Sequence, residues 1–160
     1  MIPPTGRALE DAERLALLAE MERIVGSSHL FKSLDDAGRE RTLACGFVCS
    51  YSPGDLIVKQ DDPGDTMYLV MNGTVHVETQ TPGGNIHLAE LGRGACFGEV
   101  SVLTGSPRTA TVTAETDVDC VAFARHRIER VLEDYPRVRV MLEALVEGRA
   151  RDTIEKIVKS

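Results

Sequence analysis

The chain has 160 residues, of which 42% are hydrophobic and 27% charged, a composition typical of one globular domain with flanking helices. No hydrophobic run approaches the roughly 20 residues that span a bilayer, so we expect no membrane segment. The formal net charge of −7 disfavours nucleic acids and anionic membranes as partners. The same charge requires any site for an anion to be local and well built.

The N-terminal segment and the cysteines indicate a reducing compartment. No basic region followed by an apolar stretch precedes the first helix, so we expect a cytoplasmic protein without a secretory signal. The cysteines at 45, 49, 96 and 120 form no CxxC pair, and the four histidines are scattered without ligand spacing. We therefore expect reduced, partly buried thiols, no metal and no cofactor.

Two helices are predicted before the first strand. Residues 8–25 have an amphipathic pattern with apolar side chains on one side. Ser33, with Asp36 three residues later, predicts the N-cap of a second helix that runs to about Cys45.

From Phe47 to Ala124, short apolar segments alternate with turns rich in glycine and proline. Asn72-Gly73 predicts a hairpin between two of these strands, because both residues tolerate positive φ. Strands in such a series favour a β-sandwich or barrel. The predicted strands cover residues 56–59, 67–71, 74–80, 86–91, 108–114 and 118–124.

The C-terminal part returns to helical patterns. Residues 127–134 are predicted to be helical, and Pro136 suits the first turn of another helix that extends toward Lys159. An apolar stripe along this last helix fits a lid, core packing or a dimer seam equally well. The stripe comprises Val138, Met141, Leu142, Leu145 and Val146.

Residues 97–112 interrupt the strand rhythm and carry side chains suited to a nucleotide. A single short helix is predicted from Gly98 to Leu103, and the first N–H groups of a helix attract an anion. Gly98 lets a ligand approach the backbone. Arg108 offers a planar cation that can hold a phosphate through two hydrogen bonds. Glu99 beside them can accept a hydrogen bond from a sugar hydroxyl.

This segment, FGEVSVLTGSPRTATV, closely resembles the phosphate-binding cassette of the cyclic-nucleotide-binding domain family, and the likeness covers about residues 28–147. The resemblance implies a mainly β fold, an antiparallel, jelly-roll-like β-roll. N-terminal helices and C-terminal lid helices at about 126–158 would flank this roll. Supporting matches are Leu30-Phe31, Pro53-Gly-Asp55, Pro63-Gly-Asp65, Tyr68, Asn72-Gly73 and Tyr135-Pro136.

The resemblance also implies roles for individual residues. Arg108 would pair with the exocyclic oxygens of the cyclic phosphate, and Glu99 would accept from the ribose 2′-OH. Thr109 lies where the family contacts the phosphate and sometimes a syn guanine. The rest of the implied ligand-binding set comprises the backbone N–H groups of Gly98 and Ala110, the cassette residues Phe97 and Val100, the apolar base neighbours Val70 and Leu88, and Arg149, which would stack on the base.

We therefore expect a regulatory sensor of cAMP, or of cGMP, that is not an enzyme. Residues 1–27 are assigned to an N-terminal helical extension and residues 28–160 to the cyclic-nucleotide-binding domain. Closure of the C-terminal helix would signal to an unidentified effector protein or domain. Neither nucleic acid nor membrane is an expected partner, and a homodimer is an open alternative.

Two departures from the family pattern bear on the site. Asp61 stands where the family usually has glycine before Asp62, and we expect the turn to survive because aspartate tolerates a left-handed conformation. Cys96 replaces a common aromatic or aliphatic residue before Phe97, which could slightly alter the pocket wall.

Two alternative functions are weighed against the sensor. A cupin-like metal-dependent enzyme would need clustered ligands. His76 and Glu78 form one pair, but His87 lies eleven residues farther along and no HxH is present. A domain of the same fold that signals only through protein contacts is the second alternative, and the intact Glu99 and Arg108 argue against it.

Overall fold

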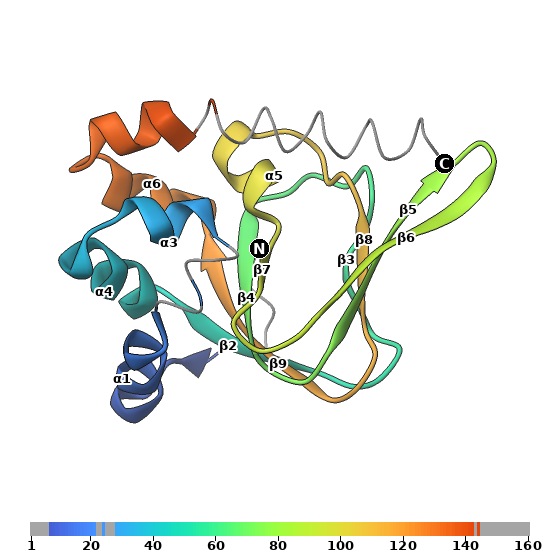
Figure 1. The fold of residues 1–160 in the computed structure, drawn as a ribbon, viewed down its shortest axis with the longest axis horizontal. Helices are drawn as coiled ribbons and strands as arrows, with labels where there is room; N and C mark the ends of the chain where they lie inside the picture. Colours follow the sequence, from blue (N-terminus) through green and yellow to red (C-terminus); the bar gives the residue numbers. More distant parts are fainter. Residues whose placement is uncertain (1–6, 22–23, 25–27, 143, 145–160) are drawn as a thin grey trace.

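Two antiparallel sheets form the body of the protein (Figure 1). The computed structural model describes residues 7–21, 24, 28–142 and 144. One sheet has the order β1-β2-β9-β4-β7 and the other β3-β8-β5-β6. The strands are β1 (Arg7–Ala8), β2 (Phe47–Tyr51), β3 (Leu56–Val58), β4 (Thr66–Asn72), β5 (Val75–Thr81), β6 (Gly84–Leu91), β7 (Cys96–Phe97), β8 (Thr111–Ala114) and β9 (Val118–Ala124).

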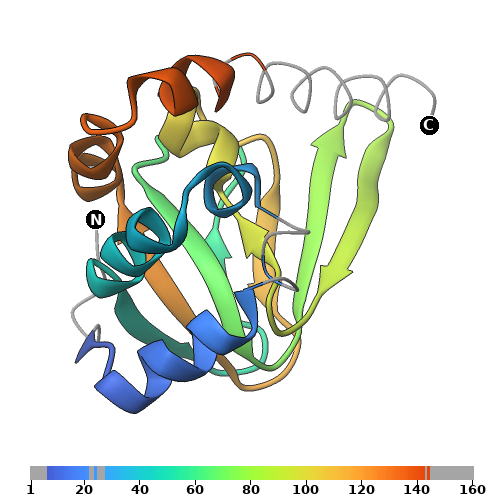
Figure 2. The ribbon, with the colours of Figure 1, turned by 60° about the vertical axis from the view of Figure 1, so that its left-hand side comes forward.

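The helices gather at one side of the sheets, and the β5–β6 hairpin extends from the other side (Figures 1 and 2). Residues 136–142 are also helical. Among the described residues, no helix has the length and apolar character needed to cross a membrane. The helices are α1 (Asp11–Ala19), α3 (His29–Ser33), α4 (Asp36–Ala44), α5 (Glu99–Thr104) and α6 (Arg125–Leu132).

The expected antiparallel roll with flanking helices is confirmed, but the hairpin predicted at Asn72-Gly73 is wrong. The strand before this turn, β4, pairs with β7 and β9, whereas the strand after it, β5, pairs with β6 and β8. Gly73 has φ +88°, and a Cβ there would lie 2.1 Å from the carbonyl oxygen of Asp117. The turn therefore packs against a neighbouring turn and carries the chain from one sheet to the other.

The cap assigned to Ser33 is also wrong. Ser33 is the last residue of α3, and Leu34 after it is extended. Ser28 caps α3 by accepting a hydrogen bond from the Phe31 N–H, and Asp35 caps α4 through the Gly38 N–H. Two short helices thus replace the single predicted one, because each has its own side-chain oxygen at the N-cap.

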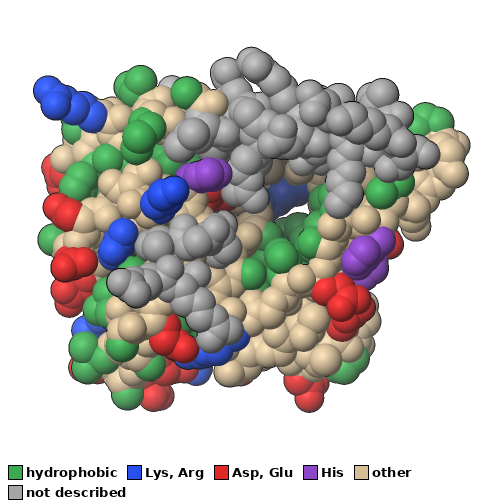
Figure 3. Space-filling view, in the orientation of Figure 1, with side chains coloured by type: hydrophobic (Ala, Val, Ile, Leu, Met, Phe, Trp, Pro, Cys, Tyr) green, Lys and Arg blue, Asp and Glu red, His purple; other side chains and the backbone are tan. Residues whose placement is uncertain are grey.

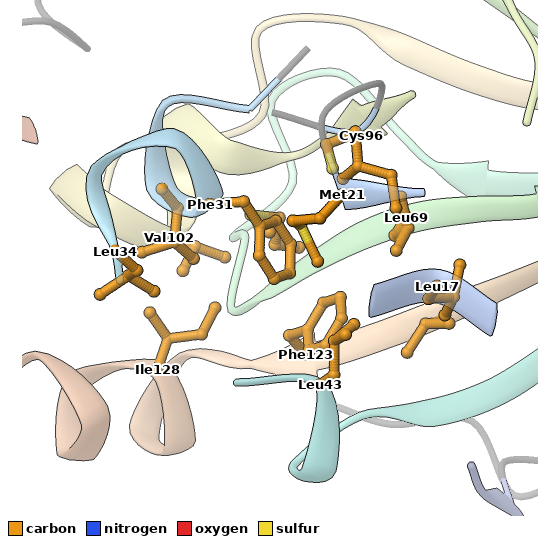
Figure 4. Close-up of a cluster of buried hydrophobic side chains, with 14 of the residues drawn as sticks. Leu17, Met21, Phe31, Leu34, Leu43, Leu69, Cys96, Val102, Phe123 and Ile128 are labelled. Carbon is orange, nitrogen blue, oxygen red and sulfur yellow. The ribbon is translucent and has the colours of Figure 1, made fainter. Parts of the chain in front are cut away.

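The main core lies between the helices and the five-stranded sheet. Phe31 and Phe123 meet edge to face with ring centroids 5.8 Å apart, and Figure 4 shows both at the centre of this cluster. Leu17 and Ile24, from the segment assigned to an extension, are each 1% exposed in the same cluster. Leu142 belongs to it as well, so part of the C-terminal apolar stripe is core packing.

Candidate functional site

Two glycines shape the predicted cassette. Gly98 is the N-cap of α5 with φ +80°, and Gly105 ends the helix with φ +76°, so both adopt a conformation that disfavours other residues. A Cβ on Gly98 would lie 2.6 Å from Arg108 Nη1 and 2.9 Å from the Thr66 carbonyl oxygen. The predicted short helix is therefore confirmed, and Gly98 is required both by its backbone and by the close approach of Arg108.

The Arg108 guanidinium is held by main-chain carbonyls. Nη2 donates to the Thr66 oxygen at 2.7 Å, and Nη1 donates to the Gly98 oxygen at 3.3 Å. The backbone of Arg108 is tied to the turn after β3, because its N–H donates to Asp62 O and its carbonyl accepts from Asp61 N–H. Asp61 has φ +72°, so the expected left-handed turn is kept without glycine.

Arg108 is 7% exposed, and this burial lowers the pKa of its guanidinium, an effect opposed by Tyr68 and Asp65 nearby. An open hollow of about 210 Å³ borders the buried cation. Figure 3 shows a hollow between the helical side and the β5–β6 hairpin that hydrophobic side chains partly line. The hollow beside Arg108 is lined by Leu56, Ile57, Val58, Lys59, Asp62, Pro63, Asp65, Thr66, Tyr68 and Arg108.

The Glu99 carboxylate is buried against α3 and is 1% exposed. It accepts hydrogen bonds from the Ser28 hydroxyl at 2.8 Å and from the His29 N–H at 3.2 Å. Ser28 Oγ in turn accepts from the Phe31 N–H, so the cassette and the start of α3 share one hydrogen-bond chain. Sequence reasoning did not anticipate this contact, because its partners are about 70 residues apart in the chain.

Comparison with known families now adds to this geometry. Residues 48–135, more than half of the chain, match the family model described as "Cyclic nucleotide-binding domain". The chain belongs to the cyclic nucleotide-binding domain family.

Relatives of this cyclic nucleotide-binding domain include regulatory and kinase proteins. A "cGMP-dependent protein kinase" from Eimeria tenella is 34% identical over 134 residues, covering 82% of this chain and 13% of the kinase. A "cAMP-dependent protein kinase regulatory subunit" from Dictyostelium discoideum is 31% identical over 134 residues, covering 83% of this chain and 39% of the subunit. The chain therefore spans less than two-fifths of these relatives.

A solved structure agrees with the family assignment. The Thermus thermophilus catabolite activator protein has a TM-score of 0.68 and 31% sequence identity, covering 81% of this chain and 62% of that protein.

Several other predicted site residues lie in the interior of this cyclic nucleotide-binding domain. Phe97 stacks on Tyr68 with centroids 5.0 Å apart and an interplanar angle of 13°. Val70 is fully buried in the same cluster, which fills the space between the two sheets. Both therefore belong to the packed core, and neither lines the hollow beside Arg108, so their predicted contacts with a ligand stay predictions.

The remaining predicted residues are more accessible. Thr109 is exposed, and its carbonyl accepts a hydrogen bond from the buried Thr79 hydroxyl at 3.1 Å. Ala110 and Leu88 are half-buried. The Val100 side chain and the whole of Arg149 lie outside the residues that the structure describes, so their predicted roles stay predictions.

Sequence reasoning missed three residues that hold the cassette in place. Thr66 supplies a carbonyl to Arg108, and Thr79 anchors the carbonyl of Thr109. Gly64 lies so close that an added Cβ would be 2.4 Å from Ser101 Cβ and 2.8 Å from Arg108 Nε. Gly64 belongs to a turn motif that the sequence did reveal, but its packing role depends on contacts 37 to 44 residues away in the chain.

Proposed function

We propose that this domain is a regulatory module that binds a cyclic purine nucleotide with its phosphate at Arg108. The observation that carries the proposal is the buried guanidinium of Arg108, fixed by two carbonyl oxygens next to the Gly98 backbone. Membership of the family supports it, as do relatives named for cGMP and cAMP dependence. In this proposal the module binds and signals but performs no catalysis.

The chemistry of Arg108 suits a phosphate. The two carbonyl contacts use one N–H on each terminal nitrogen, whereas a guanidinium has five N–H donors in a planar fork. The carbonyls fix the plane of this fork before a ligand arrives, so little side-chain freedom is lost on binding. A partly desolvated cation also forms stronger charge-assisted hydrogen bonds than an exposed one.

The ribose contact needs Glu99 to change partners. The carboxylate is 1% exposed and accepts from the Ser28 hydroxyl and from the N–H groups of His29 and Leu30, so in this proposal it turns away from at least one of these donors to reach a ribose 2′-OH. Nucleotide binding is thereby coupled to the start of α3. A ligand shifts such an equilibrium only by its differential affinity for the two arrangements.

Among ligands, cAMP is our first choice and cGMP the second. The exposed Thr109 hydroxyl at the cassette end keeps guanine in consideration, since it could contact phosphate and base together. Val70 and Leu88 are proposed to neighbour the base. The C-terminal helix is proposed to close over the base, with Arg149 stacking on it, and to pass the signal to an effector protein or domain.

Calorimetric titration with both nucleotides tests the binding proposal. Arg108→Ala should weaken binding by about 2–4 kcal/mol, because a charge-assisted contact is lost and the phosphate is left poorly paired. Arg127→Ala, which removes an exposed arginine on α6, is the matched control and should bind like the wild type. Failure of the wild type to bind either nucleotide below millimolar concentration would refute the function, and wild-type binding by Arg108→Ala would refute the site.

Hydrogen exchange tests the proposed signal. Exchange in residues 137–158 should slow when nucleotide is added, because closure protects their amides. Unchanged exchange in that segment together with tight binding would reject the lid and leave the binding site standing.

A further inference from the structure

Two histidines that are eleven residues apart in the sequence, His76 and His87, lie side by side on the β5–β6 hairpin. The register pairs His76 with Glu90 and Glu78 with His87, with a bulge between Val77 and Glu78. This pairing brings the two imidazole rings to a centroid distance of 4.6 Å. The histidines that looked scattered in the sequence thus form a cluster, because pairing across the hairpin removes their eleven-residue separation.

The cluster lies on the outside of the roll. Val75 and Val77, the neighbours of His76 along β5, pack in the cluster between the sheets. Because successive side chains on a strand point to opposite faces, His76 points outward. His87 and Glu90 are exposed, and Figure 3 shows histidine and acidic side chains together on this hairpin.

We propose that His76, His87 and Glu90 form a binding site for a zinc ion, with water completing a tetrahedral set. Each of the three offers one ligand atom, and these atoms all lie within 4.8 Å of one another. Two imidazoles and a carboxylate are ligands that Zn²⁺ prefers. Bonds of about 2.0–2.1 Å to a tetrahedral ion place its ligands roughly 3.4 Å apart, so the separations between the ligand atoms, all within 4.8 Å, need to shorten by at most about 1.4 Å.

Two further carboxylates support this assignment. Glu78 Oε2 lies 3.2 Å from Nε2 of His76, and Glu115 Oε1 lies 3.6 Å from its Nδ1. Whichever ring nitrogen binds the ion, the other therefore has a carboxylate partner, the usual arrangement that orients a metal-bound histidine. The three glutamates also supply the negative charge that a divalent cation requires.

Such an ion would crosslink β5 to β6 from the outer face, away from Arg108. The proposal is therefore independent of nucleotide binding, and either can fail without the other.

Zinc titration of the 160-residue chain tests the site. A Cys45→Ser background removes the partly exposed thiol, which could itself bind zinc. We expect one Zn²⁺ per chain, and an increase in melting temperature with zinc concentration. In NMR spectra, zinc should shift the ring signals of His76 and His87.

Single ligand variants and a matched control decide the outcome. His87→Ala and Glu90→Gln change exposed side chains, so both should fold, and each should lower zinc affinity at least about tenfold, since even outer-shell partners contribute 10- to 100-fold. His126→Ala, an exposed histidine on α6, should bind zinc like the background chain. The proposal is overturned if the His87 and Glu90 variants bind zinc as tightly as the background chain does. It is also overturned if the His126 variant loses as much zinc affinity as they do.

Discussion

At the scale of single residues, the main chain rather than an acidic side chain orients Arg108. The Thr66 and Gly98 carbonyls hold the guanidinium, and no carboxylate within the described part of the chain forms an ion pair with it at salt-bridge distance. A carboxylate in a salt bridge would compete with a phosphate for the same cation, whereas carbonyls fix the direction of the guanidinium without adding a negative charge. The glycines around Arg108 allow this close approach.

Gly64→Ala tests the importance of this approach. The added Cβ would lie 2.4 Å from Ser101 Cβ and 2.8 Å from Arg108 Nε, so we expect a loss of about 1–3 kcal/mol in unfolding free energy and weaker nucleotide binding. Denaturant unfolding and calorimetry measure the two effects. Gly83→Ala, where the nearest atom is 3.8 Å away, is the control and should change neither. A wild-type affinity in Gly64→Ala would show that the packing does not position Arg108.

Ser28→Ala tests whether Glu99 changes partners. Loss of the Ser28 hydroxyl removes a cap of α3 and a donor to Glu99, so stability should fall by about 1–2 kcal/mol. Nucleotide affinity should rise a few-fold, because the unliganded carboxylate loses a competing partner while its ribose contact is unchanged. A 2′-deoxy nucleotide is the control, since it cannot gain from a released Glu99. An equal change in affinity for the ribose and 2′-deoxy nucleotides contradicts the proposed change of partners at Glu99.

At the scale of elements, the turn between β3 and β4 acts as a frame for the cassette. Its backbone exchanges two hydrogen bonds with Arg108, through Asp61 N–H and Asp62 O. The turn motif was visible in the sequence, and the survival of its left-handed residue as Asp61 was predicted. Its pairing with Arg108 was not, because nothing local indicates which distant backbone groups complete a turn.

Substitutions at Asp61 test this frame. The residue has φ +72°, where a β-carbon is unfavourable and aspartate is better tolerated than alanine. Asp61→Ala should lower the unfolding free energy by about 1 kcal/mol and weaken nucleotide binding, whereas Asp61→Gly should match or exceed the wild type in both. Chemical denaturation gives the order of the three proteins in unfolding free energy, and titration gives their order in nucleotide affinity. An alanine variant as stable and as tightly binding as the glycine variant contradicts this prediction.

The pairing of whole strands explains why the hairpin predicted at Asn72-Gly73 is wrong. Asn72-Gly73 has the residues of a tight turn, but β4 is buried along most of its length and pairs inside the larger sheet. Local turn preference contributes little compared with the apolar burial of a central strand. The sequence therefore predicted the turn and the strands on either side of it correctly, but not that these strands pair in different sheets.

At the scale of the whole molecule, the N-terminal helix is part of the main core. Leu17, Met21 and Ile24 contact the same buried cluster as Phe31 and Phe123. A division of the chain at residue 27 therefore separates residues that share one core. Because α3 contributes Leu30 and Phe31 to this cluster, a movement of α3 on nucleotide binding would change the packing of the main core.

Leu17→Ala tests the unity of this core. Because Leu17 is 1% exposed, its truncation should lower the unfolding free energy by about 2–5 kcal/mol. Leu15→Ala on the same helix is the control, and it should change stability little because Leu15 is 63% exposed. A single unfolding transition followed by two probes is expected for both variants. Similar stability of the two variants would mean that α1 is only loosely attached.

The sequence by itself determined the class of fold, the family and the residues of the cassette, because these depend on local patterns: alternating apolar residues, turn residues and a contiguous motif. Only the tertiary structure decided that Glu99 bonds to Ser28, that Gly64 and Thr66 position Arg108, and that His76 meets His87. These contacts join residues that are distant in the chain. Their existence depends on sheet register and layer packing, which no local pattern specifies.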